Sequence, residues 1–214
     1  MKKLVIFDMD GVLVDSEKAT AESAIAALKH WGIDAEPEDF RPYRGMGERS
    51  YLGGPAEDHG VAFVPEMKER MYELYDRNIG DIKVYPWSES IVKKAKAAGY
   101  AVAVASAADK AKVDINLRRL GMTVTDFDAF VTGIDVEKKK PAPDIFLMAA
   151  AKAGYDPADS VVIEDAIAGV TAGKAAGMTV VAVTTSFPRE KLAAVGADVI
   201  TDDLSSLTDI LSKL

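Results

Sequence analysis

Short apolar runs alternate with segments of helical periodicity along most of the chain. The apolar runs are rich in β-branched residues and end at Gly, Asp or Ser, as buried strands do. We therefore predict strands at residues 4–7, 101–105, 129–132, 161–163, 179–183 and 198–200. Helices are predicted between them, for example at residues 110–120, 144–153 and 166–176. Near-continuous apolar strands with helices between them predict an α/β fold whose parallel sheet is covered on both faces.

One stretch, from Ser16 to about Gly80, interrupts this alternation. It has no convincing strand pattern, only helix-like segments separated by loops that contain Gly and Pro. In the segment 64–79 the apolar residues fall on one face of a helix, which is typical of core packing: Met67, Met71, Leu74 and Tyr75. We therefore expect a helical insert at residues 16–80, between two parts of a sheet domain at residues 1–15 and 81–214.

The composition narrows the class of protein. A chain of 214 residues with 49% hydrophobic content can bury a core without disulfide bonds or a structural metal. Because the sequence has 0 Cys, disulfides, zinc–thiolate sites and thiol nucleophiles are excluded. The formal net charge of -8 argues against nucleic acid as a partner. No apolar run approaches a membrane span, and the run at residues 4–7 is too short for a signal peptide. We expect a cytoplasmic protein, monomeric, that acts on a small molecule.

Polar side chains gather just after four of the predicted strands. The set comprises Asp8, Asp10, Ser106, Lys140, Glu164 and Asp165. The carboxyl ends of parallel strands form the ligand crevice of an open sheet, so we expect these groups to converge. The four carboxylates are hard oxygen ligands with no His or Cys beside them, and they would repel one another without a cation. This set predicts a Mg²⁺ site rather than a zinc site.

The remaining groups of the set suit a phosphoryl group. Lys140 would add a positive charge and Ser106 a hydroxyl, with backbone N–H groups at the start of the helix that follows. Ala107 is a further expected substrate contact. Together with a metal they describe a cradle for a transferring phosphoryl group. A carboxylate facing that group can act as a nucleophile, and a second one two residues on can protonate the leaving oxygen and then activate water.

Each group also has an ordinary structural interpretation. The first two acids are common turn residues, the serine is a common start of a helix, and the last two acids suit a helix N-terminus. Lys138 and Lys139 are expected to be solvated, leaving Lys140 as the lysine of the site. Three glycines four residues apart are expected to pack a helix closely on the sheet: Gly169, Gly173 and Gly177.

Four segments taken together resemble the motifs of the haloacid dehalogenase-like superfamily. They are DMDGVLVDS at residues 8–16, Ser106, KPAPD at residues 140–144 and VIEDAIAGV at residues 162–170, in order and with suitable spacing. The helical insert after the first motif is similar to the cap of the β-phosphoglucomutase-like branch. The resemblance covers essentially the whole chain and implies a Rossmann-like parallel-sheet core with an inserted helical cap domain.

The same resemblance implies a role for each residue of the set. Asp8 would be the nucleophile and Asp10 the general acid and base, with Ser106 and Lys140 binding the transferring phosphoryl group. The implied ligands of Mg²⁺ are Asp8, the backbone carbonyl of Asp10, Asp165 and, directly or through water, Glu164. Because the dehalogenases of the superfamily lack the second Asp, Asp10 favours phosphoryl chemistry.

Both phosphatases and sugar phosphomutases resemble this chain, and two positions favour a phosphatase. The mutases carry a His where this chain has Thr20, and a phosphate-binding Arg where it has Glu48, with Arg49 one place later. An acid that faces a second phosphate is unfavourable. We therefore expect a Mg²⁺-dependent phosphatase of small phosphorylated metabolites, in particular sugar phosphates, with a phosphomutase as the alternative. Thr20, Glu48 and Arg49 are the expected contacts of the leaving group.

Specificity is expected to come from closure of the cap over the core. Four charged residues of the insert could face the substrate, and each could equally be a solvated surface charge: Glu48, Arg49, Lys68 and Arg70. Residues 14–16 and about 80–85 are the two connections and hence the expected hinge. A phosphoacceptor signalling domain fits less well, because its paired acids are adjacent in sequence. A non-catalytic phosphate-binding protein fits less well because every motif residue needed for the chemistry is present.

Overall fold

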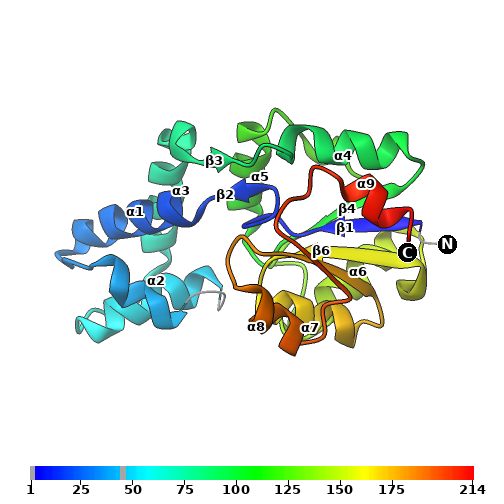
Figure 1. Ribbon diagram of the computed structural model, residues 1–214. Helices are drawn as coiled ribbons and strands as arrows, with labels where there is room; N and C mark the ends of the chain where they lie inside the picture. Colours follow the sequence, from blue (N-terminus) through cyan, green and yellow to red (C-terminus); the bar gives the residue numbers. More distant parts are fainter. Residues whose placement is uncertain (1–2, 44–46) are drawn as a thin grey trace.

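A six-stranded parallel sheet forms the centre of the computed structural model, which describes residues 3–43 and 47–214 (Figure 1). The strands lie in the order β5-β4-β1-β6-β7-β8, and all neighbouring pairs are parallel. Their bounds are β1 Leu4–Phe7, β4 Ala101–Ala105, β5 Ala129–Val131, β6 Ser160–Glu164, β7 Thr179–Val183 and β8 Val199–Thr201. Each lies within one residue of its predicted position, and the predicted α/β fold is confirmed.

Helices cover both faces of the sheet because its strands are apolar on both sides. In β1 the side chains of Val5 and Phe7 belong to one core cluster, and those of Leu4 and Ile6 to the other. The first cluster lies under α4 (Ser88–Ala97), α5 (Lys110–Arg119) and α9 (Leu207–Leu211). The second lies under α6 (Asp144–Ala153), α7 (Ile167–Ala175) and α8 (Arg189–Ala194), on the opposite side of the sheet in Figure 1.

The predicted helices α5, α6 and α7 begin and end within one residue of their expected bounds. Two 3₁₀ turns, η4 (Val124–Asp126) and η5 (Pro157–Asp159), lead into β5 and β6. In the part of the chain that the structure describes, none of the helices combines the length and the apolar character that crossing a bilayer requires.

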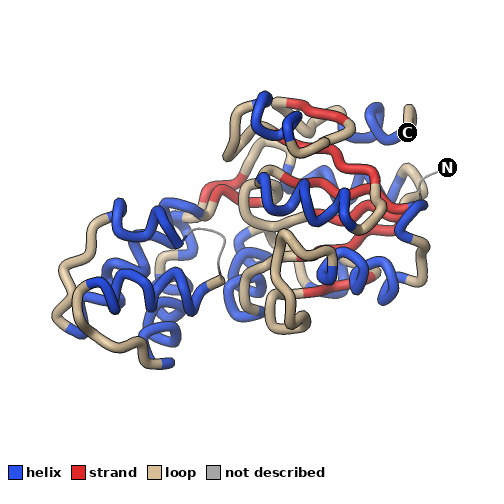
Figure 2. Tube along the Cα trace, turned by 90° about the horizontal axis from the view of Figure 1, so that it is seen from below, coloured by secondary structure: helices blue, strands red, loops and turns tan. Residues whose placement is uncertain are grey.

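The helical insert lies to one side of the sheet and has a core of its own (Figure 2). It contains α1 (Glu17–Leu28), α2 (Glu48–Asp58) and α3 (Pro65–Arg77), with the 3₁₀ turns η1 (Lys29–Trp31), η2 (Pro37–Tyr43) and η3 (Ile79–Asp81). As expected, the described residues between 16 and 82 contain no strand. That residues 16–80 and the remainder are separate domains stays a prediction.

The apolar face of α3 packs both in the core of the insert and in one core cluster of the sheet. The sequence pattern alone did not indicate this double contact. Met67 and Met71 are buried in the core of the insert, and Leu74 packs partly against it. Tyr75, at the same face but nearer the end of the helix, is buried in the core cluster of the sheet instead. One helix therefore anchors the insert on the sheet domain.

The two connections to the insert, which the sequence predicted as the hinge, pair with each other. Residues Val14–Asp15 (β2) and Lys83–Val84 (β3) form a short antiparallel ladder. Next to it the Nε1–H of Trp87 donates to the carbonyl of Val12 at 3.0 Å, and the ring of Tyr85 stacks on the Trp87 indole. Strands of two residues are too short to leave an alternating pattern in the sequence.

Of the three glycines spaced four residues apart, only Gly173 packs a helix against the sheet as predicted. A Cβ atom on Gly173 would lie 2.7 Å from Cγ2 of Val180 in β7, so this glycine permits close approach of α7 to the sheet. Gly177 has a φ of +74° and open space around its Cα atom, so it ends the helix in a left-handed conformation. The packing prediction is wrong for Gly177, and Gly169 faces a carboxylate described below.

We predict that Gly173→Ala lowers the free energy of unfolding by about 1–3 kcal/mol, because the added methyl group overpacks the contact with Val180. The matched control is Gly80→Ala, since a Cβ atom at Gly80 meets nothing within 4 Å. Its effect should stay within about 0.5 kcal/mol. Urea unfolding followed by circular dichroism measures both, and equal midpoints for the two variants would contradict the packing role.

Candidate active site

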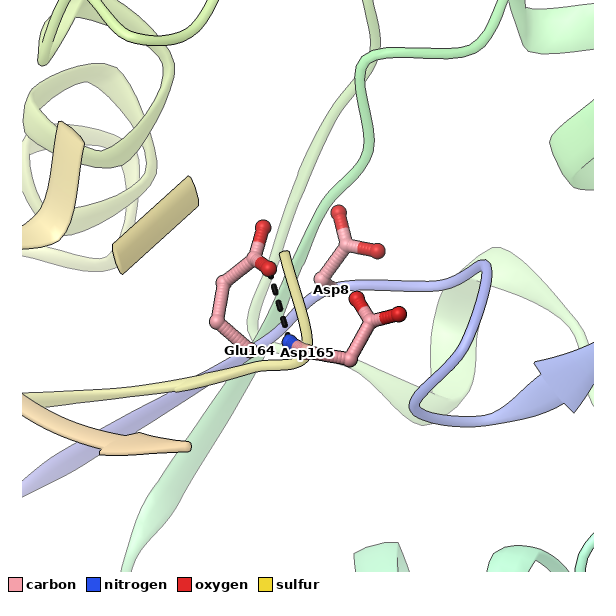
Figure 3. Close-up of side chains that lie close together, drawn as sticks. All are labelled: Asp8, Glu164 and Asp165. Carbon is pink, nitrogen blue, oxygen red and sulfur yellow. Dashed lines mark hydrogen bonds between the residues drawn. The ribbon is translucent and has the colours of Figure 1, made fainter. Parts of the chain in front are cut away.

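Three buried carboxylates meet at the carboxyl ends of two neighbouring strands (Figure 3). Asp8 follows β1, Glu164 ends β6 and Asp165 follows it. One carboxylate oxygen of each lies within 4.8 Å of those of the others, and the residues are 6%, 1% and 4% exposed. The register of the sheet brings them together, because Phe7 pairs with Ile163 and the N–H of Asp8 donates to the Ile163 carbonyl at 3.0 Å.

The ammonium group of Lys140 lies between two of these acids. Its Nζ donates to Oδ1 of Asp8 at 2.5 Å and to Oε1 of Glu164 at 2.6 Å, and its side chain is only 7% exposed. Burial opposes the charged form, but the charges of Asp8 and Glu164 outweigh it and raise the pKa of Lys140. Lys138 and Lys139 are exposed, as the sequence predicted. Lys140 is therefore a fixed positive charge beside Asp8.

Both oxygens of Glu164 have donors from the protein. While Oε1 binds Lys140, Oε2 accepts from the N–H groups of Asp165 at 2.8 Å and of Ala166 at 2.7 Å, just before α7 begins. A Cβ atom on Gly169 would lie 1.7 Å from Oε1, so the glycine makes room for this carboxylate. Glu164 thus accepts hydrogen bonds from backbone N–H groups just before α7, as the structural interpretation above expects, and also forms an ion pair with Lys140.

Asp165 is oriented by a loop that the sequence analysis overlooked. Ser186, after β7, donates its hydroxyl to Oδ2 of Asp165, and Thr185 donates to the carbonyl of Gly11 at 2.6 Å. A Cβ atom on Gly11 would lie 1.9 Å from Oδ2 of Asp165, so only glycine fits there. The signal for this loop was available, because polar residues follow the fifth predicted strand just as they follow the other four.

The three acids carry more negative charge than Lys140 balances. Burial raises the pKa of Asp8 to about 7, although Lys140 opposes the shift, and burial together with the Glu164 charge raises the pKa of Asp165 well above its usual range. Charge of this kind is relieved by a cation with a preference for oxygen ligands. The crowding and the donor set therefore fit a metal ion such as Mg²⁺, with Asp8 and Asp165 as the carboxylates still able to bind it.

The carboxylate of Asp10 has a different set of partners, so the expected group of four carboxylates is reduced to three among the described residues. Its Oδ1 accepts from the hydroxyl of Ser16 and from Nδ2 of Asn116 at 3.3 Å, and lies 3.0 Å from Nζ of Lys112. Burial alone would raise the pKa of Asp10, but the Lys112 charge and these hydrogen bonds lower it. The expected role of its backbone carbonyl stays a prediction.

Ser106 and Ala107 lie in a turn after β4 and not at the start of a helix. Ser106 is 1% exposed, and its Oγ accepts from the N–H of Ala108 at 3.2 Å. The next helix, α5, begins only at Lys110, with Asp109 as its N-cap residue. The helix thus begins where the sequence predicted it, so the backbone donors expected at its start do not include Ala107, whose N–H belongs to the loop before α5.

From the insert, Glu48 and Lys68 both contact the residue that precedes α5. Oε1 of Glu48 accepts from the N–H of Asp109 at 3.2 Å, and Nζ of Lys68 lies 2.6 Å from Oδ2 of Asp109. Burial raises the pKa of Glu48, and Lys112 opposes that shift. The hydroxyl oxygen of Thr20, on α1, is buried near Tyr75. Glu48 and Lys68 therefore contact the sheet side of the interface, while Thr20 lies beside a residue of the insert that packs there.

Two other charged residues of the insert have partners within it. The guanidinium of Arg49 lies 5.5 Å from the centroid of the Phe63 ring, and Arg70 forms an exposed ion pair with Glu73 at 2.9 Å. The structure therefore brings Glu48, and not Arg49, to the interface with the core. That Arg49 contacts a substrate stays a prediction with no support from this arrangement.

Lys112 and Asn116 were missed, although the sequence held a signal for them. They lie on the apolar face of α5 with Val113 and Leu117, next to Leu120 at the C-cap, and all five are buried. Polar residues one turn apart on such a face need partners inside the protein. The partner, Asp10, lies more than a hundred positions away in sequence, so the signal marks a buried polar site without identifying what it binds.

Comparison with known proteins gives a consistent picture. The family model described as haloacid dehalogenase-like hydrolase matches residues 5–183. The chain is 34% identical to a β-phosphoglucomutase of Bacillus subtilis, over 96% of this chain and 92% of that protein. Its structure superposes on CbbY from Rhodobacter sphaeroides in complex with phosphate with a TM-score of 0.86 and 25% identity, over 97% and 96% of the two chains.

Two relatives from Arabidopsis thaliana are longer proteins. The chain is 42% identical over 97% of its length to the chloroplastic protein SUPPRESSOR OF QUENCHING 1, but covers 20% of that protein. It is 31% identical over 98% of its length to a bifunctional riboflavin kinase/FMN phosphatase and covers 55% of it. The chain thus spans only part of the length of these two relatives.

We predict that Asp165→Asn raises the melting temperature of the metal-free protein. Because the pKa values of Asp8 and Asp165 are raised, the folded state binds more protons than the unfolded state between about pH 4 and about pH 7, so stability falls as the pH rises through this window. Asparagine removes one of the buried charges. Differential scanning fluorimetry in EDTA, at about pH 7.5 and again at lower pH, measures the effect.

The same variant should lose most of the stabilisation that Mg²⁺ gives the wild-type protein, because it removes a proposed ligand. The control is Asp34→Asn, the same chemical change at an exposed position. It should leave both melting temperatures unchanged. A variant of Asp165 that is no more stable without metal, and still responds fully to Mg²⁺, would contradict this account of the three acids.

Proposed function

The chain belongs to the haloacid dehalogenase-like hydrolase family and is an enzyme of the phosphatase type, and on this premise we propose that it hydrolyses small phosphate esters, in particular sugar phosphates. The proposed reaction requires Mg²⁺ and passes through a phosphorylated Asp8. The observation that carries the proposal is the contrast between two carboxylates two residues apart. Asp8 lies beside Lys140 and two further acids, whereas Asp10 is bound by Ser16 and α5. Two acids in different environments suit two different roles.

In the first half of the reaction an oxygen of Asp8 attacks the phosphorus atom of the ester. The bond from phosphorus to the leaving oxygen breaks, and that oxygen takes a proton from the Asp10 carboxyl group. The products of this half are the free alcohol, an acyl phosphate on Asp8 and the Asp10 carboxylate. Lys140, buried and ion-paired, supplies positive charge beside the transferring group.

In the second half a water molecule attacks the phosphorus atom of the acyl phosphate and gives a proton to the Asp10 carboxylate. The bond between phosphorus and the Asp8 oxygen breaks, which releases inorganic phosphate and restores both acids. The contacts of Asp10 with Lys112, Ser16 and Asn116 favour its carboxylate form, which is the form that accepts the proton in this half, whereas the first half requires the protonated form. The cycle is therefore balanced in atoms and protons.

The proposed metal ligands are Asp8, the backbone carbonyl of Asp10 and Asp165. When bound there, Mg²⁺ supplies positive charge to the phosphoryl oxygens and to the acids around them. Glu164 already has donors on both oxygens, so we assign it the orientation of Lys140 and of the turn before α7. Ser106, which directly follows β4, is proposed to donate its hydroxyl to the phosphoryl group.

We favour a phosphatase over a phosphomutase, although the relatives include a protein named as a β-phosphoglucomutase. A mutase must bind a second phosphate next to the insert. Two insert residues, Glu48 and Lys68, contact Asp109 before α5. Lys68 is paired with the Asp109 carboxylate, and the negative charge of Glu48 would oppose a second phosphate there. An uncharged, hydroxyl-bearing leaving group fits this acid better. The cytoplasmic location and monomeric state expected from the sequence stay predictions.

The test is a phosphorus NMR time course with Mg²⁺ and a panel of sugar phosphates, including β-glucose 1-phosphate with a trace of glucose 1,6-bisphosphate. We expect inorganic phosphate to appear from one or more substrates without formation of glucose 6-phosphate. Rapid conversion to glucose 6-phosphate with little free phosphate would replace the phosphatase proposal by the mutase alternative.

We also predict that Asp8→Asn abolishes turnover of every substrate that the wild-type protein hydrolyses. Removal of a nucleophile costs at least about a thousandfold in kcat where such residues act as a unit. The exposed variant Asp34→Asn serves as the control and should keep wild-type rates. Residual hydrolysis by Asp8→Asn at more than a few per cent of the wild-type rate would refute the nucleophile assignment.

A further inference from the structure

Two polar side chains are buried on α5, where their neighbours on the helix are apolar. Lys112 is 8% exposed and Asn116 is 0% exposed, while Val113 and Leu117 beside them are packed in the core. Lys112 and Asn116 are four residues apart and so lie on one face of the helix. Burial of an ammonium group and an amide costs free energy unless each finds a partner. Their partners therefore indicate why they are there.

Both side chains contact the same atom of Asp10. Nζ of Lys112 lies 3.0 Å from Oδ1, Nδ2 of Asn116 donates to Oδ1 at 3.3 Å, and the hydroxyl of Ser16 donates to it as well. Three donors on one oxygen fix the rotation of the carboxylate. Because all three contacts are made to Oδ1, Oδ2 is the oxygen that can exchange a proton with a substrate. The side chain of Asp10 is 31% exposed, so it is accessible.

A residue of the insert orients these donors. Tyr75, on α3 and 1% exposed, donates its hydroxyl to Oδ1 of Asn116 at 2.7 Å. With the carbonyl oxygen of the amide engaged there, the amide NH₂ group faces Asp10. The ring of Tyr75 also lies under Lys112, whose Nζ is 5.9 Å from the ring centroid. One side chain of the insert thus contacts both donors of α5.

We propose that Lys112 and Asn116 are positioning residues for Asp10, and that Tyr75 couples this positioning to the seating of the insert on the core. The inference rests on the proposed role of Asp10 as acid and base. With the insert displaced, Asn116 loses the hydroxyl that orients its amide, and Asp10 loses its fixed geometry. Proton transfer to the leaving group is then restricted to the state in which the insert shields the site.

This role has a signature that a purely structural role lacks. A sugar or glycerol oxygen leaves as a strongly basic alkoxide and needs a proton, whereas p-nitrophenolate is stable and leaves without one. Mispositioning of Asp10 therefore slows the first half of the reaction for alkyl esters and affects aryl esters much less. The ratio of kcat/KM for the two esters reports this step directly.

The experiment compares glycerol 2-phosphate with p-nitrophenyl phosphate for Lys112→Met, Asn116→Leu and Tyr75→Phe. We expect kcat/KM to fall by about tenfold or more for the alkyl ester and by less than about threefold for the aryl ester. Lys112→Arg keeps the charge and should recover part of the loss. Tyr75→Phe removes one oxygen atom and keeps the packing, so it remains informative if Lys112→Met fails to fold.

Two matched variants separate positioning from general weakening. Lys110→Met changes a lysine of the same helix that forms an exposed ion pair with Asp114 at 2.5 Å. Arg118→Gln breaks the exposed ion pair that joins α5 to Asp76 of α3 at 2.6 Å, across the same interface but away from Asp10. Both should leave the ratio of the two esters unchanged.

Equal losses for the two esters in the three test variants, or the same change of ratio in Arg118→Gln, would overturn the inference. If the wild-type protein hydrolyses neither ester nor any sugar phosphate, the proposed function has failed, and a second measurement still decides the positioning. Crystal structures of the wild type, Tyr75→Phe and Asn116→Leu should then show a displaced Asp10 carboxylate in both variants. An unmoved carboxylate would refute the inference independently of activity.

Discussion

Three buried carboxylates lie close together with one buried ammonium group between two of them, and the organisation of the site follows from that imbalance of charge. Lys140 forms ion pairs with Asp8 and Glu164, and the second carboxylate oxygen of Glu164 accepts hydrogen bonds from two backbone N–H groups. One ammonium group cannot balance three carboxylates, and burial together with the neighbouring acids raises the pKa values of Asp8 and Asp165. A buried site of this kind is unfavourable by itself and becomes favourable when it binds cations with oxygen ligands.

The sheet explains why these groups meet. In the order β5-β4-β1-β6-β7-β8, the chain first adds β4 and β5 on one side of β1 and then adds β6, β7 and β8 on the other side. The direction of winding therefore changes between β1 and β6, which is where ligands bind in open parallel sheets. Asp8 and Glu164 lie at the carboxyl ends of those two strands. The insert follows Asp10 almost directly, and α3 returns over α5, which places a helix of the insert against the partners of Asp10.

The strand positions and the residues at strand ends could be predicted from the sequence because both depend on local patterns. Asp8, Lys140, Glu164 and Asp165 are such residues, and the structure brings them together as expected. The separate environment of Asp10 could not be predicted, because it depends on how α5 and the insert pack. Glu48 contacts the core and Arg49 packs on Phe63 because of the way α2 is oriented. That orientation could not be predicted from two charged residues that are adjacent in the sequence.

The most direct test of the central claim is to look for the acyl phosphate itself. The variant Asp10→Asn keeps Asp8 but lacks the base for the second half of the reaction, and p-nitrophenyl phosphate needs no proton to enter the first. Acid quenching followed by peptide mass spectrometry should find hydroxylamine-sensitive phosphate on the peptide that contains Asp8. Phosphate on another residue, or none on a variant that still releases p-nitrophenol in a burst, would contradict the mechanism.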